Sequence, residues 1–245
     1  MLDDGVALQR KFYEETAAEF MRKRLNWHDE HYRAVSYIAR MAADWGISSF
    51  LDVGAGTGRS VGFLHDRGFA TKGIEPVEAL LQEGLRARPD LRELLQRGEG
   101  ESLPFDDCSF DAVCEFGVLH HVQRPELVIR EMLRVARKAV FISDSNRFAQ
   151  GQIPARISKF VLFKCGLWPF VNWLKTSGKG YSCSAEDGIF YSYSIYDSLD
   201  DLAAWSDDLQ LVCTMPHASR SWFQPLFTAT HLLVCAFRSG GTPRA

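Results

Sequence analysis

A glycine-rich loop is the segment of this chain best suited to bind a ligand. It lies in the run LDVGAGTGR at 51–59, with glycines at 54, 56 and 58. Glycines at this spacing let the backbone turn tightly after a strand and let a ligand approach the main chain. A dinucleotide site has a further glycine where this sequence has Arg59. The pattern therefore favours a nucleoside that carries no pyrophosphate.

Two carboxylates flank this loop in the sequence. Asp52 comes just before the glycines, and Glu75 ends the next predicted strand, about 20 residues beyond the first glycine. In nucleotide-binding folds, a carboxylate at this second position accepts hydrogen bonds from the ribose hydroxyls. The loop and Glu75 together therefore predict a nucleoside site.

The elements that must position these residues alternate between strand and helix. Apolar runs predict strands at 49–53, 71–75, 94–98, 110–116 and 138–144. Helical patterns at 58–66, after Pro76 and at 125–137 connect them. This rhythm is typical of a parallel sheet with right-handed crossovers.

The alternation stops after Asp144 and resumes near the C-terminus. A capping box formed by Ser198 and Asp201 predicts a helix at 199–207. Two further strands are expected at 209–216 and 231–238. The residues between Asp144 and this last helix form an insertion.

Four motifs occur in the order found in one enzyme family. They are LDVGAGTGR, GIEP, GEGESLPFDDCSFD and EFGVLHHV, and they cover roughly residues 45–145. In this order the motifs resemble class I S-adenosylmethionine-dependent methyltransferases. They are most similar to the small-molecule branch that includes quinone-biosynthesis enzymes (methyltransferase type 11). The resemblance implies S-adenosylmethionine as the cofactor, S-adenosylhomocysteine as the product, and a Rossmann-like fold.

The resemblance also assigns roles to single residues. Asp52 would reach the amino end of the cofactor, Glu75 would bind the ribose, and Pro76 would lie beside the adenine. An N-terminal helix with Tyr13 and Phe20 would close over the cofactor, although ordinary helix packing also explains these two residues. The implied cofactor-binding residues are Tyr13, Asp52, Gly54, Ala55, Gly56, Thr57, Gly58, Glu75, Pro76, Glu99, Gly100, Glu101, Phe116 and Gly117.

Two positions depart from the family pattern. Gly100 stands where many relatives have alanine, in a stretch that flanks the adenine. The segment Arg137-Lys138-Ala139 stands where the family often has Pro-Gly-Gly before the fifth strand. We therefore expect a different turn at 137–139.

Two adjacent histidines, His120 and His121, follow the fourth predicted strand, at the edge of the sheet where ligands bind. Methyl transfer to a hydroxyl is helped by a general base, and histidine suits neutral pH. Adjacent side chains point in different directions, so we expect one of the two to face the pocket, and His121 is the preferred catalytic residue. Packing and hydrogen bonding against the cofactor or loop is the alternative role for both.

The acceptor is expected at the end of the fifth strand and in the insertion that follows. Asp144 and Asn146 could hold the acceptor, or they could cap a helix or turn. Tyr191 and Tyr193 belong to an aromatic-rich insertion at 145–193, which predicts a lid over an acceptor with an apolar or aromatic part. A core within the insertion itself is the alternative. Four further residues could reach the pocket, although packing or exposed positions are favoured for them: His28, His31, Trp222 and Phe223.

These expectations combine into a single α/β domain over residues 1–245 with the class I methyltransferase fold. It has a mostly parallel seven-stranded sheet with helices on both faces and one antiparallel strand near the C-terminus. The expected parts are an N-terminal helical cap at 1–46, a cofactor-binding half at 47–144, a substrate lid at 145–193, and a C-terminal helix and strands at 194–245.

Charge is distributed unevenly along the chain. The formal net charge is −3, but residues 145–180 carry six Lys or Arg and no Asp or Glu. Such a segment is a solvated face, attracts an acidic substrate, or makes weak peripheral contact with an anionic membrane surface. The weakly acidic total argues against a nucleic-acid partner. So does the run Glu-Phe-Gly-Val after the fourth strand, where base-amine methyltransferases have Asn/Asp-Pro-Pro-aromatic.

Composition and cysteine spacing limit the class of protein. Of the 245 residues, 46% are hydrophobic and 24% charged, as in an ordinary globular protein. The six cysteines have no metal-ligand spacing, so we expect no metal and reduced, mostly buried thiols. The first residues lack the apolar segment of a signal peptide, and 157–174 is too interrupted to span a bilayer comfortably. These features predict a cytoplasmic protein.

Taken with the resemblance, the predicted function is methyl transfer to a small organic acceptor with an apolar or aromatic part. Oxygen is the favoured position of methylation. Methylation at carbon or nitrogen of a lipid-like or quinone-like acceptor is the alternative. A non-catalytic binding subunit with the same cofactor fold is a third possibility.

Overall fold

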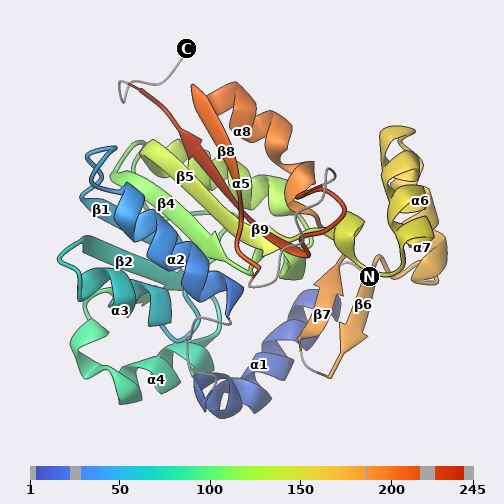
Figure 1. Cartoon of the computed structure of the whole chain (residues 1–245). Coiled ribbons are helices and arrows are strands. Elements are labelled where there is room, and N and C mark those ends of the chain that lie inside the picture. Colours follow the sequence, from blue (N-terminus) through green and yellow to red (C-terminus); the bar gives the residue numbers. More distant parts are fainter. Residues whose placement is uncertain (1–3, 23–28, 186, 216–223, 240–245) are drawn as a thin grey trace.

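A sheet with strand order β3-β2-β1-β4-β5-β9-β8 forms the centre of the molecule (Figure 1). The computed structural model describes residues 4–22, 29–185, 187–215 and 224–239. Within these ranges the seven strands are β1 (Ser49–Val53), β2 (Ala70–Glu75), β3 (Leu95–Arg97), β4 (Phe110–Phe116), β5 (Ala136–Ser145), β8 (Asp208–Cys213) and β9 (His231–Phe237).

The direction of the strands confirms the predicted topology. Strands β1 to β5 pair in parallel, whereas β9 runs antiparallel to both of its neighbours, β5 and β8. Parallel strands end at one edge of a sheet, so the residues that follow β1, β2 and β4 come together there. This edge carries the glycine loop, Glu75 and the two histidines.

Helices cover both faces of the sheet (Figure 1). One face carries α2 (Glu30–Met41) and α3 (Arg59–His65), and the other carries α5 (Pro125–Val135) and α8 (Leu199–Trp205). A further helix, α4 (Glu78–Ala87), packs on β2 and β3 and shares a core cluster with α3, and α1 (Asp4–Arg22) packs on α4. Four short 3-10 turns also occur among the described residues: η1 (Pro89–Leu91), η2 (Leu119–His121), η3 (Arg147–Ala149) and η4 (Ile195–Asp197).

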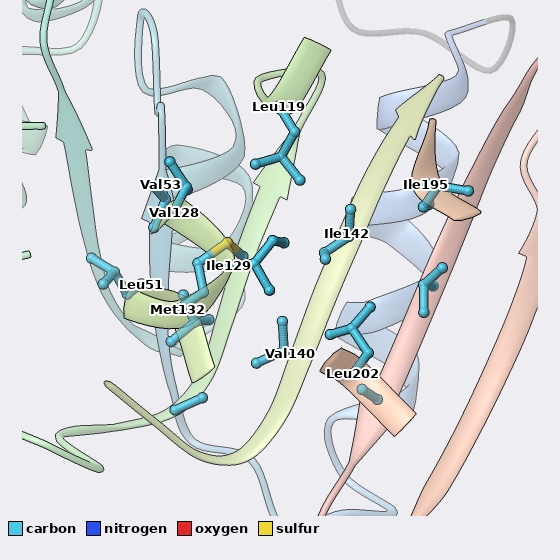
Figure 2. Packing of buried hydrophobic residues seen from close by; sticks show 14 of the residues in the cluster. Leu51, Val53, Leu119, Val128, Ile129, Met132, Val140, Ile142, Ile195 and Leu202 are labelled. Carbon is cyan, nitrogen blue, oxygen red and sulfur yellow. The ribbon is translucent and has the colours of Figure 1, made fainter. Parts of the chain in front are cut away.

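The larger core cluster lies between the sheet and α5 (Figure 2). Val128, Ile129 and Met132 recur at helical spacing and point from α5 toward Leu51 of β1 and Val140 of β5, and all five are at most 1% exposed. Burying one such side chain contributes about 1.5–3 kcal/mol. Continuous apolar runs in β1 and β5 are explained by this arrangement, because both faces of a central parallel strand are covered.

The chain passes directly from α5 into β5, which confirms that the turn at 137–139 differs from the family pattern. The helix ends at Val135 and the strand begins at Ala136. Arg137 then donates from Nε and Nη2 to Oδ1 of Asp111 on β4, at 3.1 and 2.8 Å. This ion pair fixes the start of β5 where a Pro-Gly-Gly turn is expected in relatives.

The predicted capping box before α8 is wrong by one turn. Half of such a box forms instead at the start of η4, where the backbone N–H of Ser194 donates to Oδ2 of Asp197 at 3.0 Å and the Ser194 hydroxyl has no partner among the described residues. Ser198 precedes α8 but makes no side-chain cap, because its hydroxyl pairs with the Tyr193 hydroxyl at 2.8 Å. The Ser198 hydroxyl, which was expected to cap α8, therefore bonds to a side chain outside the helix instead.

The insertion at 145–193 forms two helices and a hairpin. The helices α6 (Ile153–Lys164) and α7 (Trp168–Lys175) are followed by the antiparallel strands β6 (Tyr181–Ser184) and β7 (Gly188–Tyr191). Figure 1 shows both helices at the margin of the molecule and the hairpin next to α1. No helix among the described residues is long and apolar enough to cross a membrane.

The aromatic residues of the insertion divide into two groups. Phe160 and Phe163 of α6 pack on Phe148, with ring centroids 5.6 and 5.3 Å away. Phe170 and Trp173 of α7 are instead 61% and 53% exposed. The alternatives of a lid core and an aromatic pocket therefore do not account for the second group.

The cysteines are free thiols in varied surroundings. Cys114 and Cys235 are buried, Cys165 and Cys183 are exposed, and the remaining two are half-buried. The expectation of mostly buried thiols is therefore met only in part.

Candidate active site

A cavity lies at the carboxyl ends of β1, β2 and β4, between the glycine loop and residues of α1 and α2. All of the predicted cofactor residues except Gly58 line it, and so does His121. His120 and the four predicted substrate residues do not line it. The structure therefore brings Tyr13 and His121, which are more than 100 residues apart in the sequence, to the wall of the same cavity.

The glycine loop has the backbone conformation that its sequence predicts. Gly54, Gly56 and Gly58 all have positive φ, at 75°, 56° and 75°. A Cβ on Gly54 would lie only 2.4 Å from Cγ2 of Val118, so no other residue fits there without movement. Gly58 instead packs toward Leu95, where a Cβ would approach Cδ1 to 2.7 Å. Gly54 thus shapes the cavity, and Gly58 joins the loop to β3.

Asp52 is a buried carboxylate with one oxygen unpaired. Its side chain is 2% exposed, and Ser60 Oγ donates to Oδ2. Among the described residues, Oδ1 has no hydrogen-bond partner. Burial raises the pKa of Asp52 to about 7, partly offset by the Ser60 hydrogen bond. A buried, unpaired acceptor is costly, so Asp52 is suited to a donor or cation that enters the cavity.

Glu75 is held in place by the main chain. Gly56 N donates to Oε2 at 2.9 Å, and Val77 N donates to Oε1 at 2.8 Å. Burial raises the pKa of Glu75 to about 7, although both backbone hydrogen bonds oppose this shift. A carboxylate has about four acceptor sites, so these two bonds leave others available to a ligand.

Pro76, Leu80 and Val128 form an apolar part of the cavity wall, which we call the slot. A Cβ on Gly100 would lie 3.1 Å from Val53 and 3.2 Å from Val128, so an alanine here requires these side chains to shift by a few tenths of an ångström. Glu99 forms an ion pair with Arg10 of α1, which links the cavity wall to the N-terminal helix.

His120 pairs with a buried carboxylate behind the cavity. Its Nδ1 lies 2.7 Å from Oδ1 of Asp144, whose Oδ2 accepts from the backbone N–H of Leu119 at 2.9 Å. Burial alone would lower the pKa of His120, but the negative charge of Asp144 more than offsets this and raises it. The pair fixes the η2 turn, so His120 has a structural partner.

His121 faces the cavity and contacts both α1 and β7. Nδ1 lies 2.7 Å from the carbonyl oxygen of Ile189, and Nε2 lies 3.1 Å from the hydroxyl of Tyr13. Gln9 Nε2, a donor, also lies 3.1 Å from Nδ1, but the Ile189 carbonyl is closer and can only accept. We therefore assign the hydrogen to Nδ1, so that Nε2 accepts from Tyr13 and Gln9 Nε2 donates to Asp187. Burial, with the charge of His120, lowers the pKa of His121 to about 4. The imidazole is therefore neutral at physiological pH.

Gln9 anchors the hairpin to α1 beside this histidine. Its Nε2 donates to the carbonyl of Asp187 at 3.1 Å, and its Oε1 accepts from the backbone N–H of Ile189 at 2.5 Å. The Gln9 amide thus donates to one backbone carbonyl and accepts from one backbone N–H of the hairpin, as a neighbouring peptide group does in a sheet. These bonds place His121 between two segments that are distant in the sequence.

The sequence analysis missed several residues of the cavity wall. Gln9 and Arg10 lie one helical turn before Tyr13, a spacing that could have identified them. Arg59 follows the glycine loop directly, and burial lowers its pKa. His31, for which packing or exposure was favoured, lines the cavity, and its Nδ1 lies 3.1 Å from Ser143 Oγ.

The predicted substrate residues have partners outside the cavity wall. Asn146 caps η3 by accepting from Phe148 N at 3.0 Å, which is the alternative role considered for it. Asp144 pairs with His120, and Tyr193 is 5% exposed within the core. Tyr191 is half-buried on β7 beside Tyr181. These side chains therefore stabilise turns and neighbouring segments around the end of β5.

Some expected positions lie outside the described residues. They are His28, Trp222 and Phe223, together with the side chain of Phe20. Among the described residues, no three His, Cys, Asp or Glu side chains come together as metal ligands.

Comparison with known proteins identifies the central segment. Residues 51–142 match the family model described as a methyltransferase domain. This match confirms the resemblance that the four motifs suggested. It covers the glycine loop, Glu75 and both histidines.

Curated relatives match over the same part of the chain. A demethylmenaquinone methyltransferase of Renibacterium salmoninarum is 39% identical over 87 residues, which are 36% of this chain and 36% of that protein. A norajmaline N-methyltransferase of Rauvolfia serpentina is 36% identical over 93 residues, which are 36% of this chain and 32% of the relative. The chain thus spans about a third of the length of these relatives.

Solved structures share the fold over nearly the whole chain. A Burkholderia thailandensis 1,6-didemethyltoxoflavin-N1-methyltransferase, solved with 1,6-didemethyltoxoflavin and S-adenosylhomocysteine, superposes with a TM-score of 0.60. The match covers 96% of this chain and 89% of the other, at 15% identity. At this identity the likeness concerns the fold.

Proposed function

We propose that this chain transfers a methyl group from S-adenosylmethionine to a small organic acceptor with an apolar or aromatic part. The observation that carries this proposal is the pair of buried carboxylates, Asp52 and Glu75, which face one cavity on either side of the glycine loop. Both lie in the segment that matches a methyltransferase domain.

The residues of the cavity fit this cofactor. The unpaired Oδ1 of Asp52 suits the ammonium of its methionine part, and the remaining acceptor sites of Glu75 suit two ribose hydroxyls. The slot formed by Pro76, Leu80 and Val128 suits the flat adenine. The positive φ of Gly54 turns the backbone tightly beside Val118, so the glycine loop can form one wall of the cavity.

When bound, S-adenosylmethionine supplies a methyl group on a sulfonium, which is already a good leaving group. The chain therefore contributes mainly positioning and exclusion of water. Asp52 and Glu75 fix the two ends of the site, and α1 covers the cavity through Tyr13 and Arg10. The acceptor lies on the side of Phe116, Val35 and His121, where apolar walls surround a few polar groups.

Tyr13 and His121 are the groups placed to receive a proton from an acceptor hydroxyl. Tyr13 donates to Nε2 of His121, and a phenol oxygen that donates in this way can also accept a hydrogen bond from a hydroxyl of the acceptor. As the acceptor proton moves to Tyr13, the tyrosine proton moves to Nε2, and Nδ1 keeps its bond to Ile189 O. The low pKa of His121 keeps it neutral but weakly basic, so we expect the lower end of the usual effect, about 10²-fold.

Methylation at nitrogen or carbon is the alternative. Two of the similar proteins are named as N-methyltransferases, which favours nitrogen as the second candidate. An amine can react through its lone pair and lose its proton afterwards, so it needs the Tyr13–His121 pair less than a hydroxyl does. The two cases therefore differ in their dependence on His121.

A turnover assay separates these possibilities. Protein and S-adenosylmethionine are incubated with small phenols, aromatic amines and hydroquinones, and S-adenosylhomocysteine is quantified. We expect turnover of hydroxyl acceptors, and a loss of about 10²-fold in kcat in both His121→Ala and Tyr13→Phe. The double variant should lose little more, because the two groups act in series.

Three outcomes would change the proposal. A loss below about fivefold in His121→Ala on a hydroxyl acceptor would assign the histidine to packing. Turnover of amines alone would assign nitrogen. Tight binding of S-adenosylhomocysteine without turnover of any acceptor would favour a non-catalytic binding subunit.

A further inference from the structure

Exposed apolar side chains are concentrated on the two helices of the insertion. Of the nine large apolar side chains that are exposed in the described chain, seven lie within 153–174. They are Ile153, Ile157, Val161, Leu167, Phe170, Trp173 and Leu174, each between 49% and 68% exposed. Single exposed apolar residues are common, but a cluster of seven indicates a surface that binds another protein, a membrane or a ligand.

Each helix presents these side chains as a stripe. Ile153, Ile157 and Val161 are spaced by four residues, so they lie along one side of α6. No residue of α6 is buried, although Phe160 and Phe163 turn inward onto Phe148. On α7 the buried Trp168 donates from Nε1 to Ser192 Oγ at 3.0 Å. The opposite side of α7, with Phe170 and Trp173, is exposed. The helices are thus anchored by one side only.

Three of the six cations in this segment hold the insertion together. Arg147 is nearly buried and pairs with Asp197. Arg156 donates to the carbonyl oxygens of Gly151 and Phe227, and Lys159 donates to those of Arg147 and Gln150. These side chains are not available to a partner.

The other three cations are exposed. Lys164, Lys175 and Lys179 have no carboxylate within salt-bridge distance among the described residues, and no Asp or Glu occurs between 145 and 185. Positive charge also accumulates here, since Lys175, Arg147 and Arg156 each add to the effect of burial in lowering the pKa of Lys159. We call these three lysines and the seven exposed apolar side chains the α6–α7 surface.

We propose that the α6–α7 surface docks on an anionic lipid bilayer. Phe170, Trp173 and their apolar neighbours enter the interface, and the three lysines lie at the level of the phosphates. A bilayer of anionic lipid offers apolar depth and negative charge together, which is what this surface complements. Figure 1 shows both helices at the margin of the molecule, where a flat surface can approach them.

A second copy of the chain fits this surface less well. A two-fold contact would place the same three lysines against each other, and like charges repel. A lid over the acceptor also fits less well, because no described residue of 145–193 lines the cavity. Docking is therefore independent of the proposed methyl transfer, and its failure would leave cofactor binding unaffected.

Sedimentation with vesicles tests the charged part of the surface. The whole chain is mixed at low salt with vesicles of phosphatidylcholine alone, or of phosphatidylcholine and phosphatidylserine in equal amounts. We expect sedimentation with the second vesicles only. The variant Lys164→Gln/Lys175→Gln/Lys179→Gln should bind them roughly 10²-fold more weakly, at about fivefold per lysine.

A matched control removes the same charge elsewhere. Arg86, Arg92 and Arg130 are exposed and lie on or after α4 and on α5, away from the α6–α7 surface. The triple Arg→Gln variant at these positions should change the partition by less than about threefold. An equal loss in the control and lysine variants would overturn the proposal, because the binding would then follow net charge.

The apolar part has its own test. Phe170→Ser/Trp173→Ser keeps every charge, and both positions are exposed, so the fold should be retained by circular dichroism. We expect at least about tenfold weaker binding to the anionic vesicles. Failure of the wild-type chain to sediment at low salt would overturn the proposal. So would concentration-dependent self-association that this double variant abolishes, which would assign the surface to a second copy.

Discussion

At the scale of single residues, Asp52 and Glu75 are the two side chains that best explain ligand binding in the cavity. Each is nearly buried, and burial raises the pKa of each to about 7. The hydrogen bonds of each carboxylate to described residues leave it able to accept further ones. Carboxylates in this condition gain more from a ligand with donors or positive charge than exposed carboxylates do, because water does not compete.

The raised pKa of Asp52 predicts a pH dependence of cofactor binding. Below about pH 7 the carboxyl is largely protonated, and an ammonium group gains little from it. As pH rises toward 7, the ionised form becomes available, so affinity for S-adenosylhomocysteine should rise by up to about tenfold per pH unit and then level off. Titration calorimetry at several pH values measures this slope.

Asp52→Asn is the control for this slope. It keeps the shape of the side chain but cannot ionise, so its affinity should be lower near neutral pH and less dependent on pH. An affinity of the wild-type chain that stays constant or falls across this range would contradict the assignment of Asp52 to the ammonium.

The two histidines should differ in their effect on stability. His120→Ala leaves the buried carboxylate of Asp144 without its imidazole hydrogen-bond partner, which should lower the free energy of unfolding by about 3 kcal/mol. His120→Asn retains a donor near Oδ1 and should recover part of the loss. His121→Ala removes a neutral side chain and should cost about 1 kcal/mol. Urea unfolding at neutral pH gives these values, and equal losses in both alanine variants would contradict the assignment.

At the scale of elements, the position of α4 against the glycine loop depends on a glycine that the motif analysis did not single out. A Cβ on Gly84 would lie 2.2 Å from the carbonyl oxygen of Thr57 and 2.7 Å from its carbon. Backbone atoms cannot move aside as a flexible side chain can. Gly84 therefore allows the helix to approach the loop that forms the cavity.

Alanine substitutions in two helices test this contact. Gly84→Ala should lower the free energy of unfolding by about 1–3 kcal/mol through overpacking, and weaken binding of S-adenosylhomocysteine. Gly62 of α3 is the matched control, since its nearest neighbour is the flexible end of Arg88, at 3.1 Å. Gly62→Ala should be neutral or stabilising by up to about 1 kcal/mol, because alanine favours a helix. Thermal unfolding compares the two, and equal effects would contradict the close approach of α4.

Local sequence patterns predicted the elements that position the cofactor residues. The strand at 49–53 was predicted with its observed bounds, as was the strand at 110–116. Periodicity and the glycine loop suffice there because both strands are buried and the loop geometry needs glycine. The capping box was placed at Ser198 instead of Ser194, because the hydroxyl of Ser198 bonds to Tyr193. A tertiary partner of this kind leaves no mark in a local pattern.

At the scale of the whole molecule, one side of the cavity is closed by segments that are far apart in the sequence. Gln9 of α1 bonds to Ile189 of β7, and Tyr13 bonds to His121 after β4. Sequence analysis found Tyr13 through the family resemblance and His121 through its place after the fourth predicted strand, but it could not pair them. It also gave the insertion at 145–193 as a lid, whereas its contribution near the cavity comes from the backbone of β7.

Binding of S-adenosylhomocysteine to Glu75→Ala is the most direct test of the central claim, that the cavity beside the glycine loop is a cofactor site. Titration calorimetry of the wild-type chain should show one site. Glu75→Ala should weaken binding by roughly 2–4 kcal/mol, or about 30- to 1,000-fold in Kd, through loss of two charge-assisted hydrogen bonds. The exposed Glu93→Ala should bind as the wild type does. Undiminished affinity in a folded Glu75→Ala variant, or no binding to the wild-type chain, would contradict the account.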